Sequence, residues 1–490
     1  MQKKITMTEI NKINNLLPDV HLVYLMTENS EIEQILLTKT EESYLRQQIK
    51  ASRKSININA FYRWMFFRII DTKIDINESK EKLRREASSL INILKEHKIN
   101  SIQIVNTTGK AQHTLAFIEG LLLGQYAFTK YLTQKEESAW MLEKIMIYDF
   151  QTDHEDINEL KNICEAVYFT RDLINEPPNT LNTVYLTEQA QNMASENNID
   201  IKVFDKKEIE AMGMGGLLAV NRGSVDPPVF IHLTYKPQNA INTQPYVIVG
   251  KGITFDTGGL NIKPGDSMNG MKSDMSGAAA ILGCLMALAK NKVPVHVIGL
   301  IPSTDNRPGF NAFATGDIIK MMDGSTVEML NSDAEGRMIL ADALHYAKQF
   351  NPVLVIDIAT LTGSASAAVG RNATVAFAKT EESIYQTLEK SSFITWERIV
   401  RFPLWDDYAE MLKSEIADCK NIGNRHAGAI TAAKFLERFT QYPWIHLDIA
   451  GPAFLDQKDS YRGVGGTGVG VRLIYYFFKN ILKDHIQNKI

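Results

Sequence analysis

Three glycine-rich segments in the second half of the chain concentrate residues that can do chemistry. They are VGKGITFDTGGLNIKPG at 249–265, MKSDMSGAAA at 271–280 and NSDAEGR at 331–337. Each lies where the pattern changes from strand to helix, and ligands of open α/β sheets bind at the carboxyl ends of strands. Alternate residues of an extended segment point the same way, so Asp333, Glu335 and Arg337 are expected to face one site.

Four carboxylates from these segments would repel one another unless cations neutralise them. They are Asp256, Asp274, Asp333 and Glu335. Oxygen ligands without Cys or His suit Mg²⁺, Mn²⁺ or Zn²⁺, and carboxylates able to bridge suggest two ions ~3.5–4 Å apart. Such a pair lowers the pKa of a bound water and polarises a carbonyl or phosphoryl oxygen. Lys263 and Arg337 would then stabilise a developing oxyanion. Lys251, close to the cations, would lose its proton and could bind a metal as a neutral amine.

Each segment taken singly also has an ordinary structural interpretation. A glycine-rich loop after a strand is commonly structural or binds phosphate. Asp274 alone would be a helix cap, and NSDAEGR alone could be a turn with Asp333 as the cap and Glu335 in the first helical turn. Three such segments, each at a strand-to-helix junction, favour a dinuclear metal hydrolase over coincidence. His446, inside WIHLDIA, is predicted to be buried and hydrogen-bonded.

The elements that must position these residues follow a strand–helix alternation. Strands are predicted at 246–249, 293–301, 353–359 and 444–449, with helices at 276–289 and 337–350. The strand VLVIDIA is too apolar to have a solvated face, as in a sheet covered on both sides. The first 150 residues alternate as well, with strands at 20–26 and 99–106 and helices at 81–97 and 113–128. We therefore predict an α/β protein with a small N-terminal α/β domain at 1–150, a linker helix at 151–172 and a larger C-terminal α/β catalytic domain at 173–490.

Composition narrows the class of protein further. The chain has 490 residues, 44% of them hydrophobic, and a net charge of -4, which argues against bulk electrostatic binding to nucleic acid. The basic run at 80–85 is interpreted as a solvated helix face, with a partner or nucleic-acid surface as the alternative. Three widely spaced cysteines fit a reducing compartment, and neither a signal peptide nor a membrane span is visible. We expect a soluble, intracellular protein.

The three segments resemble the metal-site segments of the leucyl aminopeptidase (cytosol aminopeptidase) family. NSDAEGR differs from the family signature NTDAEGR at one position, and the likeness covers roughly residues 165–475. It extends to RDLINEPPN, NRGSVDPP, AGAITAAKFL and WIHLDIAGPA, whereas the N-terminal third resembles the family more loosely. The resemblance implies a two-domain subunit whose larger domain carries a mixed sheet flanked by helices. It also implies a cytoplasmic homohexamer.

Matched residue by residue, the resemblance implies a role for each candidate. The metal ligands would be Lys251, Asp256, Asp274, Asp333 and Glu335. Of these, Asp256 and Glu335 would bridge the two ions. Lys263 would polarise the scissile carbonyl, and Arg337 would hold a bicarbonate ion that acts as general base. The substrate-binding positions would be Met271, Thr360, Leu361, Gly363 and Ala450, with Thr360 and Leu361 contributing backbone groups.

The predicted function is a metal-dependent aminopeptidase that releases N-terminal Leu or another apolar residue from short peptides. Its ions would be Mn²⁺ or Zn²⁺, with Mg²⁺ or Co²⁺ as the alternative in one site. A two-metal phosphoesterase is the first competing hypothesis, because the same kind of centre serves both reactions. A peptidase with a secondary DNA-binding or regulatory role is the second. Ser332 in place of the signature Thr keeps the hydroxyl and should be tolerated, and Asp305 stands where the family usually has Glu.

Overall fold

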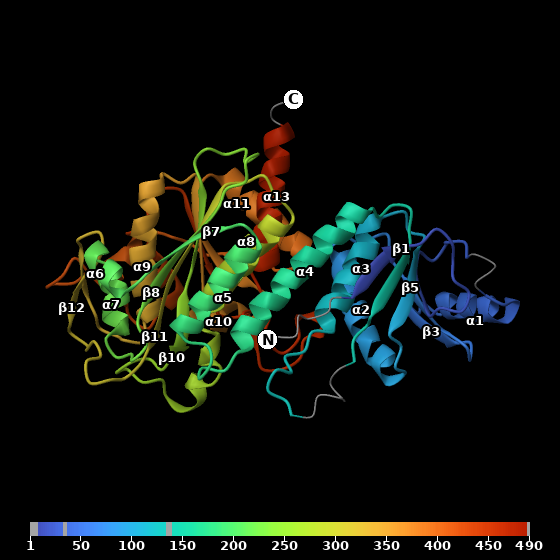
Figure 1. Cartoon of the computed structure of the whole chain (residues 1–490), viewed down its shortest axis with the longest axis horizontal. Coiled ribbons are helices and arrows are strands. Elements are labelled where there is room, and N and C mark those ends of the chain that lie inside the picture. The colour runs from blue at the N-terminus through green and yellow to red at the C-terminus, as the bar shows by residue number, and fades with distance from the viewer. Residues whose placement is uncertain (1–7, 33–36, 134–139, 488–490) are drawn as a thin grey trace. The chain divides into compact units, whose positions relative to one another are not determined.

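The computed structural model describes residues 8–32, 37–133 and 140–487, and the chain forms two compact units (Figure 1). The first comprises Met1–Glu165 and Lys458–Gly463, and the second comprises Ala166–Gln457 and Val464–Ile490. The change from one unit to the other falls within helix α4 (His154–Asn175), where the sequence predicts a linker helix at 151–172. The short segment at 458–463 differs from that expectation, because it belongs to the first unit rather than to the C-terminal domain.

The first unit contains a six-stranded sheet with the strand order β1-β6-β5-β2-β4-β3. Neighbouring strands are parallel except β3 and β4, which are antiparallel. Every residue of β2 is buried, as expected for a strand covered on both faces. The elements are β1 (Glu9–Lys12), β2 (Leu22–Met26), α1 (Lys39–Lys50), β3 (Ser55–Asn59), β4 (Trp64–Ile69), α2 (Ile76–Glu96), β5 (Ser101–Asn106), α3 (Ala111–Gly124), β6 (Lys144–Tyr148) and the 3-10 turn η7 (Ser460–Arg462).

Helix α2 carries the basic run at 80–85, and its charges are paired with acidic side chains. Lys82 is exposed, and its Nζ lies 2.8 Å from Oε1 of Glu78. Arg84 is buried, and its Nε lies 2.5 Å from Oε2 of Glu119. The interpretation of this run as a solvated face is therefore correct for Lys82 and wrong for Arg84. Arg84 lies on the buried side of α2, which faces α3.

The second unit contains a nine-stranded mixed sheet. Its strand order is β16-β15-β18-β14-β9-β11-β8-β7, with β10 pairing to β11. The central strands β18, β14, β9, β11 and β10 run parallel, while β15 and β8 are antiparallel to the central strands that they join. This sheet confirms the α/β fold class and the mixed sheet that the resemblance implies. The strands are β7 (Asp200–Phe204), β8 (Val229–Tyr235), β9 (Tyr246–Gly250), β10 (Gly252–Asp256), β11 (Val297–Asn306), β14 (Leu354–Ala359), β15 (Thr374–Lys379), β16 (Ile399–Arg401) and β18 (Trp444–Asp448).

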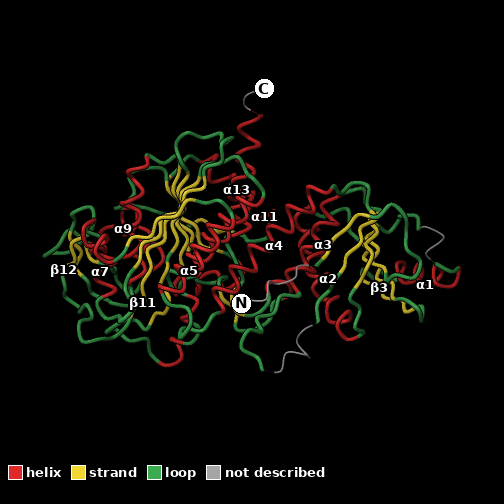
Figure 2. The backbone as a smooth tube through the Cα atoms, viewed as in Figure 1, coloured by secondary structure: helices red, strands yellow, loops and turns green. Residues whose placement is uncertain are grey.

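Helices cover both faces of this sheet, as Figure 2 shows. On one face α8 packs closely, since a Cβ added to Gly250 would lie 2.6 Å from the carbonyl oxygen of Gly277. On the other face, α9 and α12 pack against apolar side chains such as Val249 and Val355. The helices are α5 (Thr183–Glu196), α6 (Lys206–Met212), α7 (Gly215–Asn221), α8 (Ser276–Lys290), α9 (Glu335–Ala347), α10 (Gly363–Val369), α11 (Glu382–Thr395), α12 (Gly428–Glu437) and α13 (Val471–Gln487).

Shorter elements complete the second unit. Two small sheets pair β12, β13 and β17, and β19 with β20. Their strands are β12 (Ile318–Lys320), β13 (Thr326–Glu328), β17 (Cys419–Lys420), β19 (Phe454–Leu455) and β20 (Gly465–Gly466). The 3-10 turns are η2 (Gly265–Met268), η3 (Met271–Ser273), η4 (Lys348–Phe350), η5 (Gly370–Asn372) and η6 (Asp406–Leu412). Within the described residues, no helix is both long and apolar enough to cross a membrane.

The parallel centre of the large sheet brings four strand ends to one edge. β10 ends at Asp256, β11 at Asn306, β14 at Ala359 and β18 at Asp448. Parallel strands end in the same direction, so their carboxyl ends share this edge, where open α/β sheets bind ligands. The loops that follow these strands carry most of the candidate residues.

Candidate functional site

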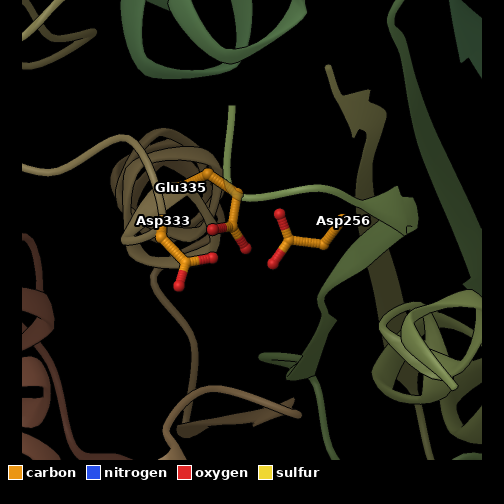
Figure 3. A group of neighbouring side chains, drawn as sticks. All are labelled: Asp256, Asp333 and Glu335. Carbon is orange, nitrogen blue, oxygen red and sulfur yellow. The ribbon is translucent and has the colours of Figure 1, made fainter. Parts of the chain in front are cut away.

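Three carboxylates converge at this edge. Asp256 is the last residue of β10, Glu335 is the first residue of α9, and Asp333 lies in the turn just before α9. Each offers an oxygen, and these oxygens lie within 4.8 Å of one another. Figure 3 shows the three carboxylates turned toward a common space. Asp256 and Glu335 are buried, whereas the Asp333 side chain is 31% exposed, so solvent reaches the group from the Asp333 side.

Two lysines form ion pairs with these carboxylates and add Asp274 to the group. Nζ of Lys251 lies 2.8 Å from Oδ2 of Asp274 and 2.9 Å from Oε1 of Glu335. Nζ of Lys263 lies 2.8 Å from Oδ2 of Asp256 and 2.6 Å from Oδ1 of Asp333. All five predicted metal ligands and Lys263 thus form one connected cluster.

Burial and neighbouring charges shift the pKa values of the clustered side chains in opposite directions. Burial alone would lower the pKa of Lys251, but attraction to Asp274, Glu335 and Asp256 raises this pKa above its ordinary value. Burial raises the pKa of Asp274 well above its usual range, although Lys251 opposes this shift. The raised pKa favours the ammonium form of Lys251, so to act as a neutral ligand it would have to give up its proton when an ion binds.

Asp256 is held by groups that the sequence reasoning missed. Its Oδ1 accepts hydrogen bonds from Gly258 N and from Nδ2 of Asn306, both at 2.8 Å. Asn306 ends β11 and pairs in register with Asp256 across the two parallel strands. The amide thus aims one carboxylate oxygen and leaves the other to face Lys263. The sequence offered one signal for this role, because Asn306 is a polar residue at the end of the buried strand that contains STDN.

The segment that carries Asp333 is tied down from two sides. Ser332 Oγ donates to the carbonyl of Gly258 at 2.6 Å and accepts from Asn261 N at 2.8 Å. Asn421 accepts from Leu330 N at 2.8 Å and donates to the carbonyl of Asn331 at 2.8 Å. Asn421 lies far along the chain from these partners, so no local sequence pattern could predict these hydrogen bonds.

Arg337 corrects an expectation. The helix α9 already begins at Glu335, so Glu335 and Arg337 lie in a helix and do not alternate along an extended chain. Nη1 of Arg337 donates to the carbonyl of Asn421 at 2.8 Å. Its Nε is buried and has no hydrogen-bond partner in the part of the chain that the structure describes. Burial lowers the pKa of Arg337 to about 10, while Glu335 and Asp448 oppose this effect.

The capping alternatives for the two aspartates are wrong. Met275 is the N-cap of α8, and Ala334 is the N-cap of α9, so neither Asp274 nor Asp333 occupies a cap position. Asp274 instead ion-pairs with Lys251 and accepts a hydrogen bond at Oδ1 from Oγ1 of Thr360, at 2.7 Å. Glu335 does lie in the first turn of its helix, as that alternative supposed.

Of the predicted substrate-binding residues, Thr360 contacts the cluster, since its carbonyl accepts from Nζ of Lys251 at 3.0 Å. Leu361 N and Ala450 N both donate to Oδ1 of Asp448, at 3.1 and 3.2 Å. Met271 opens the 3-10 turn that ends just before Asp274, and Gly363 is the first residue of α10.

The residues present fit divalent metal ions. Four carboxylates and one lysine nitrogen form an oxygen-rich donor set of the kind that holds Mn²⁺, Mg²⁺ or Zn²⁺. Gly336 makes room for the lysine, because a Cβ there would lie 2.6 Å from Cε of Lys251. Neighbouring polar groups orient two of the donors through hydrogen bonds, as is usual around metal ligands. Asn306 donates to Asp256, and Thr360 donates to Asp274.

The catalytic domain of the cytosol aminopeptidase family matches residues 168–475 of this chain. The chain belongs to this family. It is an aminopeptidase, and therefore a hydrolase, of a metal-dependent family, which confirms the resemblance found in the sequence.

Curated relatives and a solved structure agree with this membership. The "Probable cytosol aminopeptidase" of Geobacter sulfurreducens is 42% identical over 409 residues, 82% of each chain. The protein of the same name from Aquifex aeolicus is 41% identical over 399 residues, 80% of each chain. The bottromycin maturation enzyme BotP in complex with Mn has a TM-score of 0.83 and 28% identity, covering 95% of this chain and 100% of that chain. The likeness thus spans both units of the fold.

Proposed function

We propose that this chain is a two-metal aminopeptidase that releases N-terminal residues, preferably Leu or another apolar residue, from short peptides. The observation that carries the proposal is the convergence of Asp256, Asp333 and Glu335, with oxygens within 4.8 Å of one another. The proposed setting is intracellular peptide turnover in the cytoplasm by a homohexamer, as the family resemblance implies. The N-terminal α/β domain is proposed to serve assembly or regulation rather than catalysis.

Two divalent ions, Mn²⁺ or Zn²⁺, would be held by five side chains, with Mg²⁺ or Co²⁺ as the alternative in one site. These side chains would be Lys251, Asp256, Asp274, Asp333 and Glu335, which form one cluster. When bound, such ions lower the pKa of water and polarise a carbonyl. The Mn named with BotP makes Mn²⁺ the first ion to test.

Lys263 would stabilise charge on the substrate. Its Nζ bonds to both Asp256 and Asp333, so its position is set by two carboxylates rather than by its own flexible chain. A fixed ammonium beside the scissile carbonyl favours the oxyanion that forms in the transition state over the neutral carbonyl of the ground state. Lys263 is therefore proposed as a catalytic residue.

Arg337 would orient a bicarbonate ion, and its buried guanidinium suits an anion. Its Nε has no hydrogen-bond partner among the described residues, and a buried donor left unpaired is costly. When bound, this anion supplies a general base. The bond from Arg337 to the carbonyl of Asn421 would hold the guanidinium while protons move.

The backbone beyond β14 would meet the substrate, with Thr360 and Leu361 contributing backbone groups. The N–H of Leu361 is already engaged by Asp448. The free α-amine of the substrate would bind one of the metal ions, which would explain attack at the first peptide bond only. Met271, Thr360, Gly363 and Ala450 are proposed to line the side-chain pocket, which decides the preference for Leu.

Hydrolysis of leucine p-nitroanilide tests the proposal. The purified protein should lose activity with a chelator and regain it with Mn²⁺ or Zn²⁺. Asp333→Ala should lower kcat/KM by about 100-fold or more, because a ligand is lost. Activity that is indifferent to metal, or an unimpaired Asp333→Ala variant, would overturn the mechanism. Faster hydrolysis of p-nitrophenyl phosphate would favour the phosphoesterase, and the mass of the assembly in solution tests the hexamer.

A further inference from the structure

Strand β18 carries a row of buried polar side chains that the proposed function does not use. Trp444, His446 and Asp448 alternate along this strand and therefore share one face, and all three are buried. The neighbouring strand β14 runs parallel, with Asp357 opposite His446. His446 is buried and hydrogen-bonded, as the sequence predicted, with Nδ1 lying 2.6 Å from Oδ1 of Asp357.

Both carboxylate oxygens of Asp448 are committed to the loop that follows β14. Oδ2 accepts from Oγ1 of Thr362 at 2.7 Å, and Oδ1 accepts from Leu361 N at 3.1 Å. Oδ1 also accepts from Ala450 N, which closes the turn after β18. Asp448 is only 1% exposed, so these bonds do not compete with solvent. One carboxylate thus fixes the segment 361–362 to the end of the neighbouring strand.

The other side of the same loop bears on two predicted metal ligands. The carbonyl of Thr360 accepts from Nζ of Lys251 at 3.0 Å, and Oγ1 of Thr360 donates to Oδ1 of Asp274 at 2.7 Å. The segment 360–362 is therefore held between Asp448 on one side and Lys251 with Asp274 on the other. A shift of this segment would misplace the partner of both ligands at once.

Hydrogen-bonding side chains of β14 and β18 lie behind Asp448. Burial alone would lower the pKa of His446, but attraction to Asp357 and Asp448 raises it above its ordinary value, although Arg337 opposes this. Burial raises the pKa of Asp448, and attraction to His446 opposes that shift. Asp357 is held in turn by Nε1 of Trp444, which donates to its Oδ2 at 2.6 Å. Asp448 is thus a supported, oriented acceptor.

We propose that Asp448 is a positioning residue of the aminopeptidase reaction. It holds the segment 360–362 so that Thr360 presents its carbonyl to Lys251 and its hydroxyl to Asp274. This role rests on the proposed function of the site, which the experiment below separates from the role itself.

Two substitutions at one position separate geometry from charge. Asp448→Asn keeps an oxygen for Leu361 N and Ala450 N, and its amide can donate to the hydroxyl of Thr362. Asp448→Ala removes every one of these bonds. We expect kcat/KM for leucine p-nitroanilide to fall about 10–100-fold in the alanine variant. The asparagine variant should stay within about fivefold of the wild type, because it rescues the geometry.

Asp342→Asn is the matched control for general destabilisation. Asp342 is also fully buried and also accepts from two backbone groups, Leu217 N and Met322 N, both at 3.0 Å, but it is not part of the site. We expect this variant to lose thermal stability while keeping kcat/KM per metal-loaded subunit within about threefold. Activity is therefore normalised to the metal content and to the folded fraction of each preparation.

Binding of Mn²⁺ gives a readout that does not depend on activity. The metal-free proteins compete with a chromophoric chelator for Mn²⁺, and we expect Asp448→Ala to bind about tenfold more weakly than Asp448→Asn. If Asp448→Ala does not fold, Thr362→Val and Thr362→Ser replace it, since only serine keeps the hydroxyl that meets Asp448. The valine variant should then show the lower kcat/KM and the weaker Mn²⁺ binding.

The outcomes distinguish the two proposals. If Asp448→Ala matches Asp342→Asn in normalised kcat/KM and in Mn²⁺ affinity, the positioning role is overturned and the peptidase stands. An asparagine variant as impaired as the alanine variant also overturns it, because geometry would then not be what matters. If the wild type does not cleave leucine p-nitroanilide but Mn²⁺ affinity still falls in Asp448→Ala alone, the peptidase proposal fails and the positioning of the metal ligands stands.

Discussion

The ammonium nitrogen of Lys251 lies 2.8 Å from a carboxylate oxygen of Asp274, and both side chains are almost fully buried. The same nitrogen lies 2.9 Å from Glu335, so one ammonium is shared between two carboxylates. A bound ion and the lysine serve the same carboxylates, which couples metal binding to the charge of Lys251.

Substituting this lysine should destabilise the metal-free protein. Lys251→Met leaves Asp274 and Glu335 buried without their cation, and breaking a buried ion pair from one side costs about 3–5 kcal/mol. Denaturant unfolding after chelation measures the loss, and added Mn²⁺ should recover part of it. Lys413→Met is the control, because Lys413 pairs with Glu410 on the exposed surface and should matter little. Equal stability of metal-free Lys251→Met and wild type would contradict a stabilising role of the Lys251 ion pairs.

The hydroxyl of Ser332 should matter more than its size. Ser332→Ala removes the bonds to Gly258 and Asn261 and leaves the buried carbonyl of Gly258 without this donor, which costs about 1–3 kcal/mol. We also expect kcat/KM to fall about 10–100-fold, since both metal-site loops lose their shared tie. Ser332→Thr keeps the hydroxyl and should stay within about threefold of the wild type. Unfolding and steady-state kinetics of both variants check this, and equal behaviour of the two would refute it.

Gly363 tests the proposed pocket without disturbing the fold. A Cβ added there would meet no atom of the described residues within 4 Å. Gly363→Ala should therefore leave stability unchanged. If the position lines the pocket, the methyl should lower the ratio of kcat/KM for leucine to that for alanine p-nitroanilide by about tenfold. An unchanged ratio would remove Gly363 from the substrate-binding residues.

Asp342 should make stability depend on pH. Burial raises the pKa of Asp342 to about 7 from its ordinary value of 3.8, so the folded chain binds this proton more tightly than the unfolded chain does. Its stabilising contribution is complete below about pH 4 and is lost as the pH rises through about 7. The free energy of unfolding of the wild type, relative to Asp342→Asn, should fall by up to about 1.4 kcal/mol per pH unit in this window. Denaturant unfolding at several pH values measures the difference, and a flat profile would contradict it.

Several features of the site were readable in the sequence because they are local. Asp256 ends β10, and Asp274, Asp333 and Glu335 lie at or just before the starts of α8 and α9. Ligands of open α/β sheets bind at the carboxyl ends of strands such as β10. The apolar run at 353–359 predicted a strand covered on both faces, and every residue of β14 is indeed buried. These inferences needed only residue types, their spacing and the periodicity of the segments around them.

Other features depended on which strands become neighbours. Asn306 reaches Asp256 because β10 and β11 pair in parallel, and Asp448 reaches Leu361 because β18 lies beside β14. The start of α9 at Glu335 also decided that Glu335 and Arg337 lie in a helix rather than in an extended segment.

Residue types and spacing thus determined which side chains this protein offers to a metal and to a peptide. The folded arrangement determined which carboxylate each lysine balances and which groups hold the ligands in place. The physical reason is that ion pairs and hydrogen bonds form between atoms a few ångströms apart in space. The order of strands in a sheet can set such distances between residues that are widely separated along the chain.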